Sequence, residues 1–255
     1  MNGNIGYAKE SPKDRRGEHP KERSMFLEGV KACLPTLFGY FSIGFAAGIV
    51  EKTAGLSLLE IALLCLLLYA GSAQFILAGM VQTAFSAIAV AVTIFFVNLR
   101  HLLFSAALAP YFWRTRPAAN FAVGALLTDE SFGVASDFAA RNGYINEKWM
   151  HGLNVTAYLG WFAANMAGAA VGQYIESPTA WGMDFALPAM FIGLLVMQMQ
   201  SRGELAADVA VAIVAAVSAV FFSLAFSSSV GVILATVTAA TFGLGVERWK
   251  SARKS

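Results

Sequence analysis

The feature that most constrains this chain is an arginine inside a long apolar run. The stretch from Ala84 to Ala109 has 26 residues and is apolar except for three hydroxyl side chains and the segment Asn98-Leu99-Arg100-His101. About 20 helical residues cross a bilayer core, so this run is long enough to span a membrane. An arginine at the centre of such a span costs roughly 2.5–3.5 kcal/mol before it finds a partner. Either the fold supplies Arg100 with a counter-ion, or the helix tilts and the side chain reaches the lipid headgroups.

The composition places the rest of the chain in a membrane as well. Of its residues, 57% are hydrophobic and 13% are charged, and the mean hydropathy is +0.61, whereas about a quarter of the residues are charged in soluble domains. Long apolar runs recur without alternating ten-residue strands, which predicts an all-α, polytopic transmembrane helical bundle. Cys33 and Cys65 lie alone in apolar runs, so no disulfide, metal site or cofactor is expected.

The apolar runs predict seven to eight spans within one transporter domain, residues 25–247. Residues 1–24 form a charged segment without apolar periodicity, and we expect a disordered cytoplasmic tail there. Residues 248–255 form a basic cytoplasmic tail. The runs are Met25–Val50, Leu56–Met80, Ala84–Ala109, Phe121–Ala140, Trp149–Ile175, Phe185–Met199, Leu205–Phe226 and Val230–Val246.

The basic residues leave the number of spans open. The positive-inside rule places both tails and the segment with Arg141 and Lys148 in the cytoplasm, and eight spans satisfy this. Eight spans also put Arg114 and Arg116 outside, against the rule. If residues 117–140 form a re-entrant hairpin, these two arginines become cytoplasmic, but seven spans remain and the N-terminal tail moves outside.

The second apolar run predicts a broken helix. It begins as a strongly apolar helix and changes character between Tyr69 and Phe75, with Gly71 and Ser72 at the centre. A break there leaves unpaired amides at the start of the second half-helix, where the helix dipole is positive. Such an end suits an anionic group such as a carboxylate. A continuous helix that packs through its Gly-Ser pair is the alternative.

Two adjacent carboxylates are candidates for the counter-ion of Arg100. Asp129 and Glu130 interrupt a weak apolar segment, and Asp137 follows two turns later. Carboxylates at membrane depth must be paired, hydrated or protonated. We expect Asp129 to pair with Arg100 and Glu130 to take up and release a proton. A solvated loop between two half-spans is the alternative.

Short patterns indicate a weak internal repeat. Gly39-Tyr40-Phe41 and Gly160-Trp161-Phe162 each precede a stretch of small residues, and transporters built from duplicated halves show such symmetry. Small residues also let membrane helices approach closely, so we expect a separate partner helix to pack on two glycine faces. These faces are Gly39, Gly44 and Gly48, and Gly160, Gly168 and Gly172.

Four motifs stand in order along the chain: Tyr69–Phe75 (YAGSAQF), Asn98–His101 (NLRH), Leu127–Glu130 (LTDE) and Leu187–Phe191 (LPAMF). Together they resemble the AzlC family of branched-chain amino acid permeases. The resemblance extends from about Met25 to the C-terminal tail. The first motif departs mildly from the family, in which Ala-Ser often stands in place of Ser72-Ala73.

The resemblance implies a secondary transporter in the bacterial cytoplasmic (inner) membrane. It implies export of valine, leucine and isoleucine, often with methionine, driven by the proton motive force, and a small hydrophobic AzlD-like membrane subunit as partner. The motif residues then take expected roles. Substrate binding is assigned to Tyr69, Gly71, Ser72, Gln74 and Asn98, and a proton and charge network to Arg100, His101, Asp129, Glu130 and Asp137.

Two other function classes compete with export. An uptake permease or a channel has the same sequence features, because primary structure does not encode the direction of transport, the preferred amino acid, the coupling ion or the oligomeric state. An intramembrane enzyme could use acids and a histidine at depth. The sequence has no H-E-x-x-H and no G-x-S-x-G motif, so we expect no enzyme activity. We expect no nucleic-acid partner.

Overall fold

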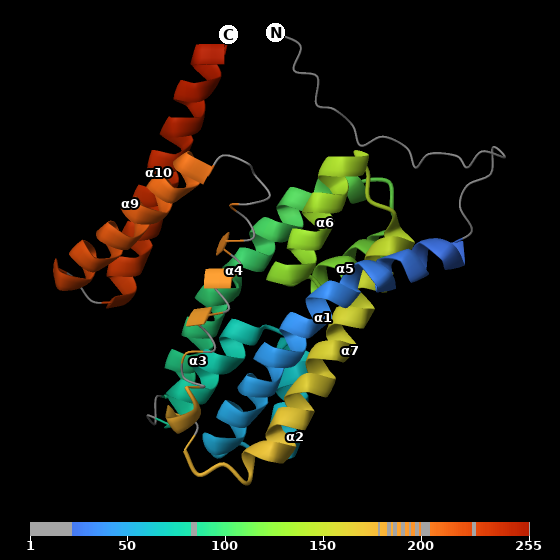
Figure 1. The fold of residues 1–255 in the computed structure, drawn as a ribbon, viewed down its shortest axis with the longest axis vertical. Helices are drawn as coiled ribbons and strands as arrows, with labels where there is room; N and C mark the ends of the chain where they lie inside the picture. The colour runs from blue at the N-terminus through green and yellow to red at the C-terminus, as the bar shows by residue number, and fades with distance from the viewer. Residues whose placement is uncertain are drawn as a thin grey trace. The chain divides into compact units, whose positions relative to one another are not determined.

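The described part of this protein is helical and contains no strand, which confirms the all-α prediction. The computed structural model describes residues 22–82, 86–177, 179–182, 185, 188–189, 192–193, 195–196, 199, 205–225 and 228–254. The chain divides into two units, Met1–Ile192 and Gly193–Ser255 (Figure 1). Among the described helices, three are long and apolar enough to cross a membrane: Ser24–Thr53, Ala87–Phe112 and Leu205–Ala225. The count of seven to eight spans stays a prediction.

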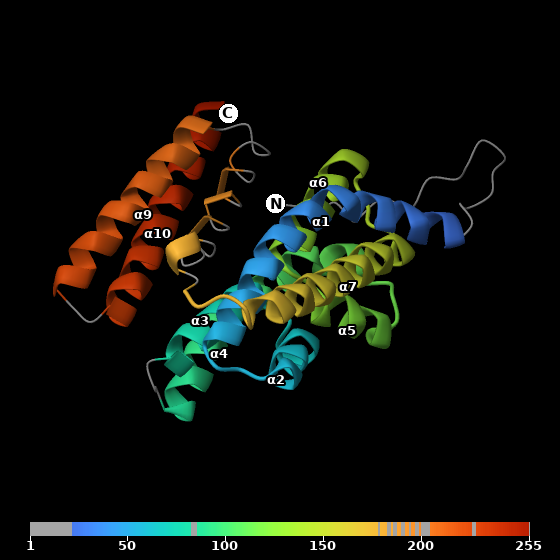
Figure 2. The ribbon, with the colours of Figure 1, turned by 60° about the horizontal axis from the view of Figure 1, so that its bottom comes forward.

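Helices α1 (Glu22–Thr53) and α7 (Glu147–Gly172) lie side by side in the first unit and run in the same direction (Figures 1 and 2). Phe26 meets Gly152 near their starts, and Ile49 meets Gly172 near their ends. Tyr40 and Trp161, from the two echoed sequence patterns, face each other halfway along, with ring centroids 5.7 Å apart.

Glycine allows the backbones of α1 and α7 to touch. A Cβ atom at Gly48 would overlap the carbonyl oxygen of Asn165, and one at Gly168 would overlap that of Phe45. The expected docking of a separate partner helix on these glycine faces is therefore wrong: the helices of this chain already cover them. The glycines covered in this way are Gly44, Gly48, Gly160, Gly168 and Gly172, whereas Gly39 has open space around it.

The second predicted span is broken and folds back on itself. Its elements in order are α2 (Leu58–Leu63), the π-helix η1 (Leu64–Leu68) and α3 (Gly71–Gln82). Tyr69 adopts a left-handed backbone (φ 42°) between the two arms, so the predicted break is present, just before Gly71. The side-chain amide of Gln74 donates to Cys65 Sγ at 3.3 Å, which brings the two arms together. We call this element the α2–α3 hairpin.

A second pair of short helices forms the α5–α6 hairpin. Helix α5 (Pro117–Ala125) starts with proline at its first position, where no helical amide is lost. Helix α6 (Asp129–Asn142) starts at Thr128, whose hydroxyl accepts from the Ser131 amide in a capping box. Residues 126–128 connect the two helices and form the tip of the hairpin.

Helix α4 (Ala87–Phe112) passes both hairpins. Its first half follows α3 in the opposite direction, and its second half lies against α5, where Asn120 donates to the Phe112 carbonyl oxygen at 3.1 Å. At its middle, Arg100 contacts Ser72 in the first turn of α3 and Asp129 in the first turn of α6. The two hairpins therefore enter the first unit from opposite ends, and their tips meet beside Arg100 (Figure 1).

In the second unit, α9 (Leu205–Ala225) and α10 (Ser228–Lys254) pack against each other in opposite directions. A Cβ atom at Gly231 would meet Ser223, and one at Gly243 would meet Val211. These helices coincide with the last two predicted spans, and α10 continues through the basic segment to Lys254. The charged segment 1–24 lies largely outside the described residues, and so does about half of the predicted span Phe185–Met199.

The glycine contact predicts a difference between two alanine substitutions on α1. Gly48→Ala places a methyl group against the α7 backbone and should destabilise the fold by about 1–3 kcal/mol. Gly39→Ala points into open space and should be neutral or stabilising, by up to about 1 kcal/mol, because alanine favours the helix. Thermal unfolding of both purified variants in the same detergent measures the difference. Equal melting temperatures would contradict the packing of α1 on α7.

Candidate functional site

A buried ion pair joins the tips of the two hairpins. Arg100 Nη2 lies 3.0 Å from Asp129 Oδ2 and donates to Ser72 Oγ at 2.5 Å. Only 19% of the Arg100 side chain and 12% of the Asp129 side chain are exposed. Two opposite charges that leave water together offset part of each other's desolvation cost. Arg100 thus has a counter-ion at its own depth, as the sequence predicted, and this cation bridges the starts of α3 and α6.

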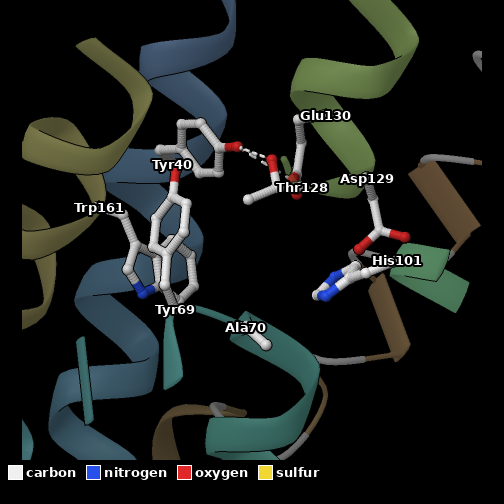
Figure 3. Close-up of a pocket in the computed structure, with 9 residues that line it drawn as sticks. Tyr40, Tyr69, Ala70, His101, Thr128, Asp129, Glu130 and Trp161 are labelled. Carbon is white, nitrogen blue, oxygen red and sulfur yellow. Dashed lines mark hydrogen bonds between the residues drawn. The ribbon is translucent and has the colours of Figure 1, made fainter. Parts of the chain in front are cut away.

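A small cavity lies beside this pair. About 10 Å³ of it is open to a water-sized sphere, which is roughly the space of one water molecule. Figure 3 shows Tyr40, Tyr69 and Trp161 on one side, facing the start of α6. The hairpin tips must separate before a larger solute can enter. The lining residues are Tyr40, Tyr69, Ala70, Gly71, His101, Thr128, Asp129, Glu130 and Trp161.

The two acids at the tip of the α5–α6 hairpin have different neighbours. Asp129 pairs with Arg100, whereas Glu130 accepts a hydrogen bond from the Tyr40 hydroxyl at 3.1 Å. The same hydroxyl lies 2.5 Å from Thr128 Oγ1 (Figure 3). Because the arginine stabilises the charge of Asp129, a proton held at this tip would reside on Glu130.

Gln74 fixes one wall of the cavity. Its side chain is fully buried, and its Oε1 accepts from Trp161 Nε1 at 2.7 Å while its amide donates to Cys65. A buried amide is stable only when it is hydrogen-bonded. The bond from Trp161 attaches the α2–α3 hairpin to α7 and holds the Trp161 ring in place, and the bond to Cys65 joins the two arms of the hairpin.

The structure brings most of the predicted site residues together and leaves two elsewhere. Asn98 is not among the cavity residues, because it lies two positions before Arg100 and so on another face of α4. Asp137 is not in the charge network: its carboxylate forms an exposed pair with Arg141 at 2.9 Å, two turns beyond the tip. The residues at or next to the cavity are Tyr69, Gly71, Ser72, Gln74, Arg100, His101, Asp129 and Glu130. Their roles stay predictions.

Four cavity residues were not predicted: Tyr40, Ala70, Thr128 and Trp161. The repeated Gly-aromatic-Phe pattern contains both Tyr40 and Trp161 and was a signal for them. Thr128 stands in the LTDE motif at a helix N-cap position, which its residue type favours. Within the described residues, no group of three or more His, Cys, Asp or Glu side chains could hold a metal ion.

Comparisons with known proteins agree on one family. The family model described as AzlC protein matches residues 35–175, more than half of the chain. Inner membrane protein YgaZ of Escherichia coli is 30% identical over 222 residues, which cover 84% of this chain and 89% of the relative. An uncharacterized membrane protein of Archaeoglobus fulgidus is 30% identical over 217 residues, 84% of this chain and 92% of the relative.

The branched-chain amino acid transport protein AzlC of Bacillus subtilis is 24% identical over 186 residues, 71% of this chain and 72% of the relative. No solved structure matches. The segment that the family model matches contains every residue of the cavity and of the ion pair.

The ion pair predicts that a substitution at Asp129 rescues one at Arg100. Arg100→Gln leaves Asp129 as an uncompensated buried charge, which costs on the order of 3–5 kcal/mol and should reduce the amount of folded protein in the membrane. Adding Asp129→Asn removes that charge and should restore much of the folded protein. Fluorescence-detected size exclusion of detergent extracts measures the folded amount.

The exposed pair on α6 is the matched control. Arg141→Gln should change the folded amount little, because an exposed pair contributes about 0–1 kcal/mol. If Arg100→Gln alone were as abundant as wild type, the pair would have no structural role and the side chain would instead reach the headgroups.

Proposed function

Because this chain belongs to the AzlC family, we propose that it is a secondary transporter that exports branched-chain amino acids, valine, leucine and isoleucine, often with methionine. The single observation that carries the proposal is the meeting of two hairpin tips at a buried ion pair beside a cavity. Transporter sites lie where discontinuous helices meet at the middle of the membrane. The name of the Bacillus subtilis relative supports the substrate class, and that of the Escherichia coli relative supports the bacterial inner membrane.

The cavity residues suit the three parts of an aliphatic amino acid. Helix α3 starts at Gly71 on the cavity wall, so its first amides and its positive dipole end can bind the carboxylate. The aromatic rings of Tyr69 and Trp161 offer an apolar wall for the side chain. The amino group then lies toward Glu130.

Glu130 can couple the substrate to protons. A carboxylate that binds either a proton or the substrate ammonium, but not both, exchanges one for the other. Uptake of a proton at Glu130 from outside then drives release of the amino acid there. Asp129 does not compete for the proton or for the substrate ammonium, because it is already paired with Arg100. This exchange is antiport driven by the proton motive force.

We also propose that both hairpins are re-entrant. The 12 residues of α3 and the 14 of α6 reach about 18 and 21 Å at 1.5 Å per residue, which is short of a bilayer core of about 30 Å. In the first unit, α1 and α4 then cross the membrane, α7 runs along α1 in the same direction, and neither hairpin crosses.

This topology removes the conflict among the basic residues. The start of α1, the α4–α5 connection and the α6–α7 connection all lie at one end of the first unit. That end carries Arg114, Arg116, Arg141 and Lys148, so the positive-inside rule makes it cytoplasmic together with the N-terminal segment.

Cysteine accessibility tests this topology. In a background without Cys33 and Cys65, Ser24→Cys and Ala118→Cys should both react with an impermeant maleimide only from the cytoplasmic side, and Ser177→Cys only from outside. Eight full spans would expose Ala118→Cys outside, and seven spans with one hairpin would expose Ser24→Cys outside. Either result would contradict the paired hairpins.

Amino acid efflux from cells tests the function. Cells without this protein, fed valine- or leucine-containing dipeptides, should accumulate the free amino acid, and wild-type protein should lower that level. Glu130→Gln should fold but fail to lower it, because the proton step is lost. Asp137→Asn, an exposed acid on the same helix, should act like wild type. Reduced uptake in cells without the protein would indicate an uptake permease instead.

The same cells test the proposed partner. We propose a small hydrophobic AzlD-like membrane subunit on the basis of the family resemblance, with a docking surface other than the glycine faces. Efflux should then require both genes. Full transport by this chain alone in liposomes would argue against the subunit.

A further inference from the structure

Glu51 is a fully buried acid outside the cavity. It lies in the last turn of α1 and is 0% exposed. Neither of its carboxyl oxygens has a hydrogen-bond partner among the residues that the structure describes. Buried polar atoms are almost always hydrogen-bonded in native proteins, so an exception indicates a special role.

Three features of its surroundings favour the neutral acid. An ionised carboxylate without water or a partner is far more costly than a protonated one. The last turn of a helix is the negative end of its dipole, which repels an anion. The ammonium of neighbouring Lys52 donates to the Leu56 carbonyl oxygen at 3.3 Å. These surroundings suit a neutral carboxyl group at Glu51 better than a charged one.

Few titratable groups surround Glu51. The Cys65 thiol of η1 is close enough to interact with it electrostatically. On α2, Glu60 is exposed and accepts from Ser57. Helix α3 has no titratable side chain, and the acids of α6 meet α1 at Tyr40, about three turns away. The α7 residues that contact the end of α1 carry no titratable group: Asn165, Ala169 and Gly172.

A chain of contacts joins this end of α1 to the cavity. Cys65, which interacts electrostatically with Glu51, accepts from Gln74, and Gln74 in turn accepts from Trp161, a cavity wall. Cys65 stands in a π-helix, and left-handed Tyr69 follows it. Such irregular turns are frequent at functional sites. A displacement of η1 would therefore move the wall of the cavity.

We propose that Glu51 is a proton-binding residue that keeps the α2–α3 hairpin closed on α1 when protonated and releases it when ionised. Ionisation requires water at the carboxylate, and the α2–α3 hairpin, which packs on α1 through α2 and α3, must move away before water can enter. This movement carries Cys65 and Gln74 with it and opens the cavity. The inference deepens the proposed proton coupling, since it adds a second proton site apart from Glu130.

The reactivity of Cys65 tests this inference without any substrate. The purified full chain in detergent is labelled with N-ethylmaleimide from pH 6 to pH 9, and peptide mass spectrometry reads Cys65 separately from Cys33. Cys33 is buried on α1 and corrects for the general rise of thiol reactivity with pH. The Cys65-to-Cys33 labelling ratio should rise with pH, by up to about tenfold per unit, as the ionised fraction of Glu51 grows.

Variants at Glu51 separate this role from simple packing. Glu51→Gln and Glu51→Leu stay neutral at every pH, so both should keep a low, flat ratio, whereas Glu51→Asp should regain the rise. Glu60→Gln, an exposed acid on the same hairpin, should behave like wild type. A flat ratio in wild type, or a rise that survives in Glu51→Gln, overturns the proposal. A correct labelling pattern in a protein without amino acid efflux would instead refute the proposed function alone.

Discussion

The bridge from Arg100 to Ser72 and Asp129 is the interaction on which the first unit depends. Two hairpins end in the interior of the protein, where backbone and side-chain polar groups have no bulk water. Helix α4 supplies one cation to both tips, Thr128 caps α6, and Gln74 fastens the other hairpin to α7. Without the cation, Ser72 in the first turn of α3 and Asp129 in the first turn of α6 would lose their common partner.

Local sequence signals were enough to predict the parts of this site that each depend on one segment. An arginine in an apolar run needs a counter-ion, and the adjacent acids Asp129 and Glu130 were candidates, of which Asp129 was assigned to the pair that the structure shows. The break before Gly71 followed from a change of composition within one helix. The structure places Asp137 and Asn98 away from the cavity, and the sequence did not indicate this because helical spacing gives a face but does not say which neighbour covers it.

The arrangement of the segments could not be predicted in the same way. The run Leu56–Met80 has the length of a full span, and only the left-handed Tyr69 and the bond from Gln74 to Cys65 make it turn back. The glycines of α1 indicated a close helix contact but not that α7 would provide it. Aromatic residues such as Tyr40 look like ordinary lipid-facing or core residues until the fold places them at a cavity.

The parallel contact of α1 with α7 also limits how the protein can move. Backbone touches backbone at Gly29 and again at Gly48, so these helices cannot slide past each other without steric overlap, and tilting them apart would lose this close packing. Each hairpin, by contrast, packs on this pair through side chains and enters from its own end of the unit. The cavity would then open to one side of the membrane at a time, as one hairpin moves away while α1 and α7 stay in place. The two sides of the membrane would be served by separate gates, each with its own acid, Glu51 or Glu130.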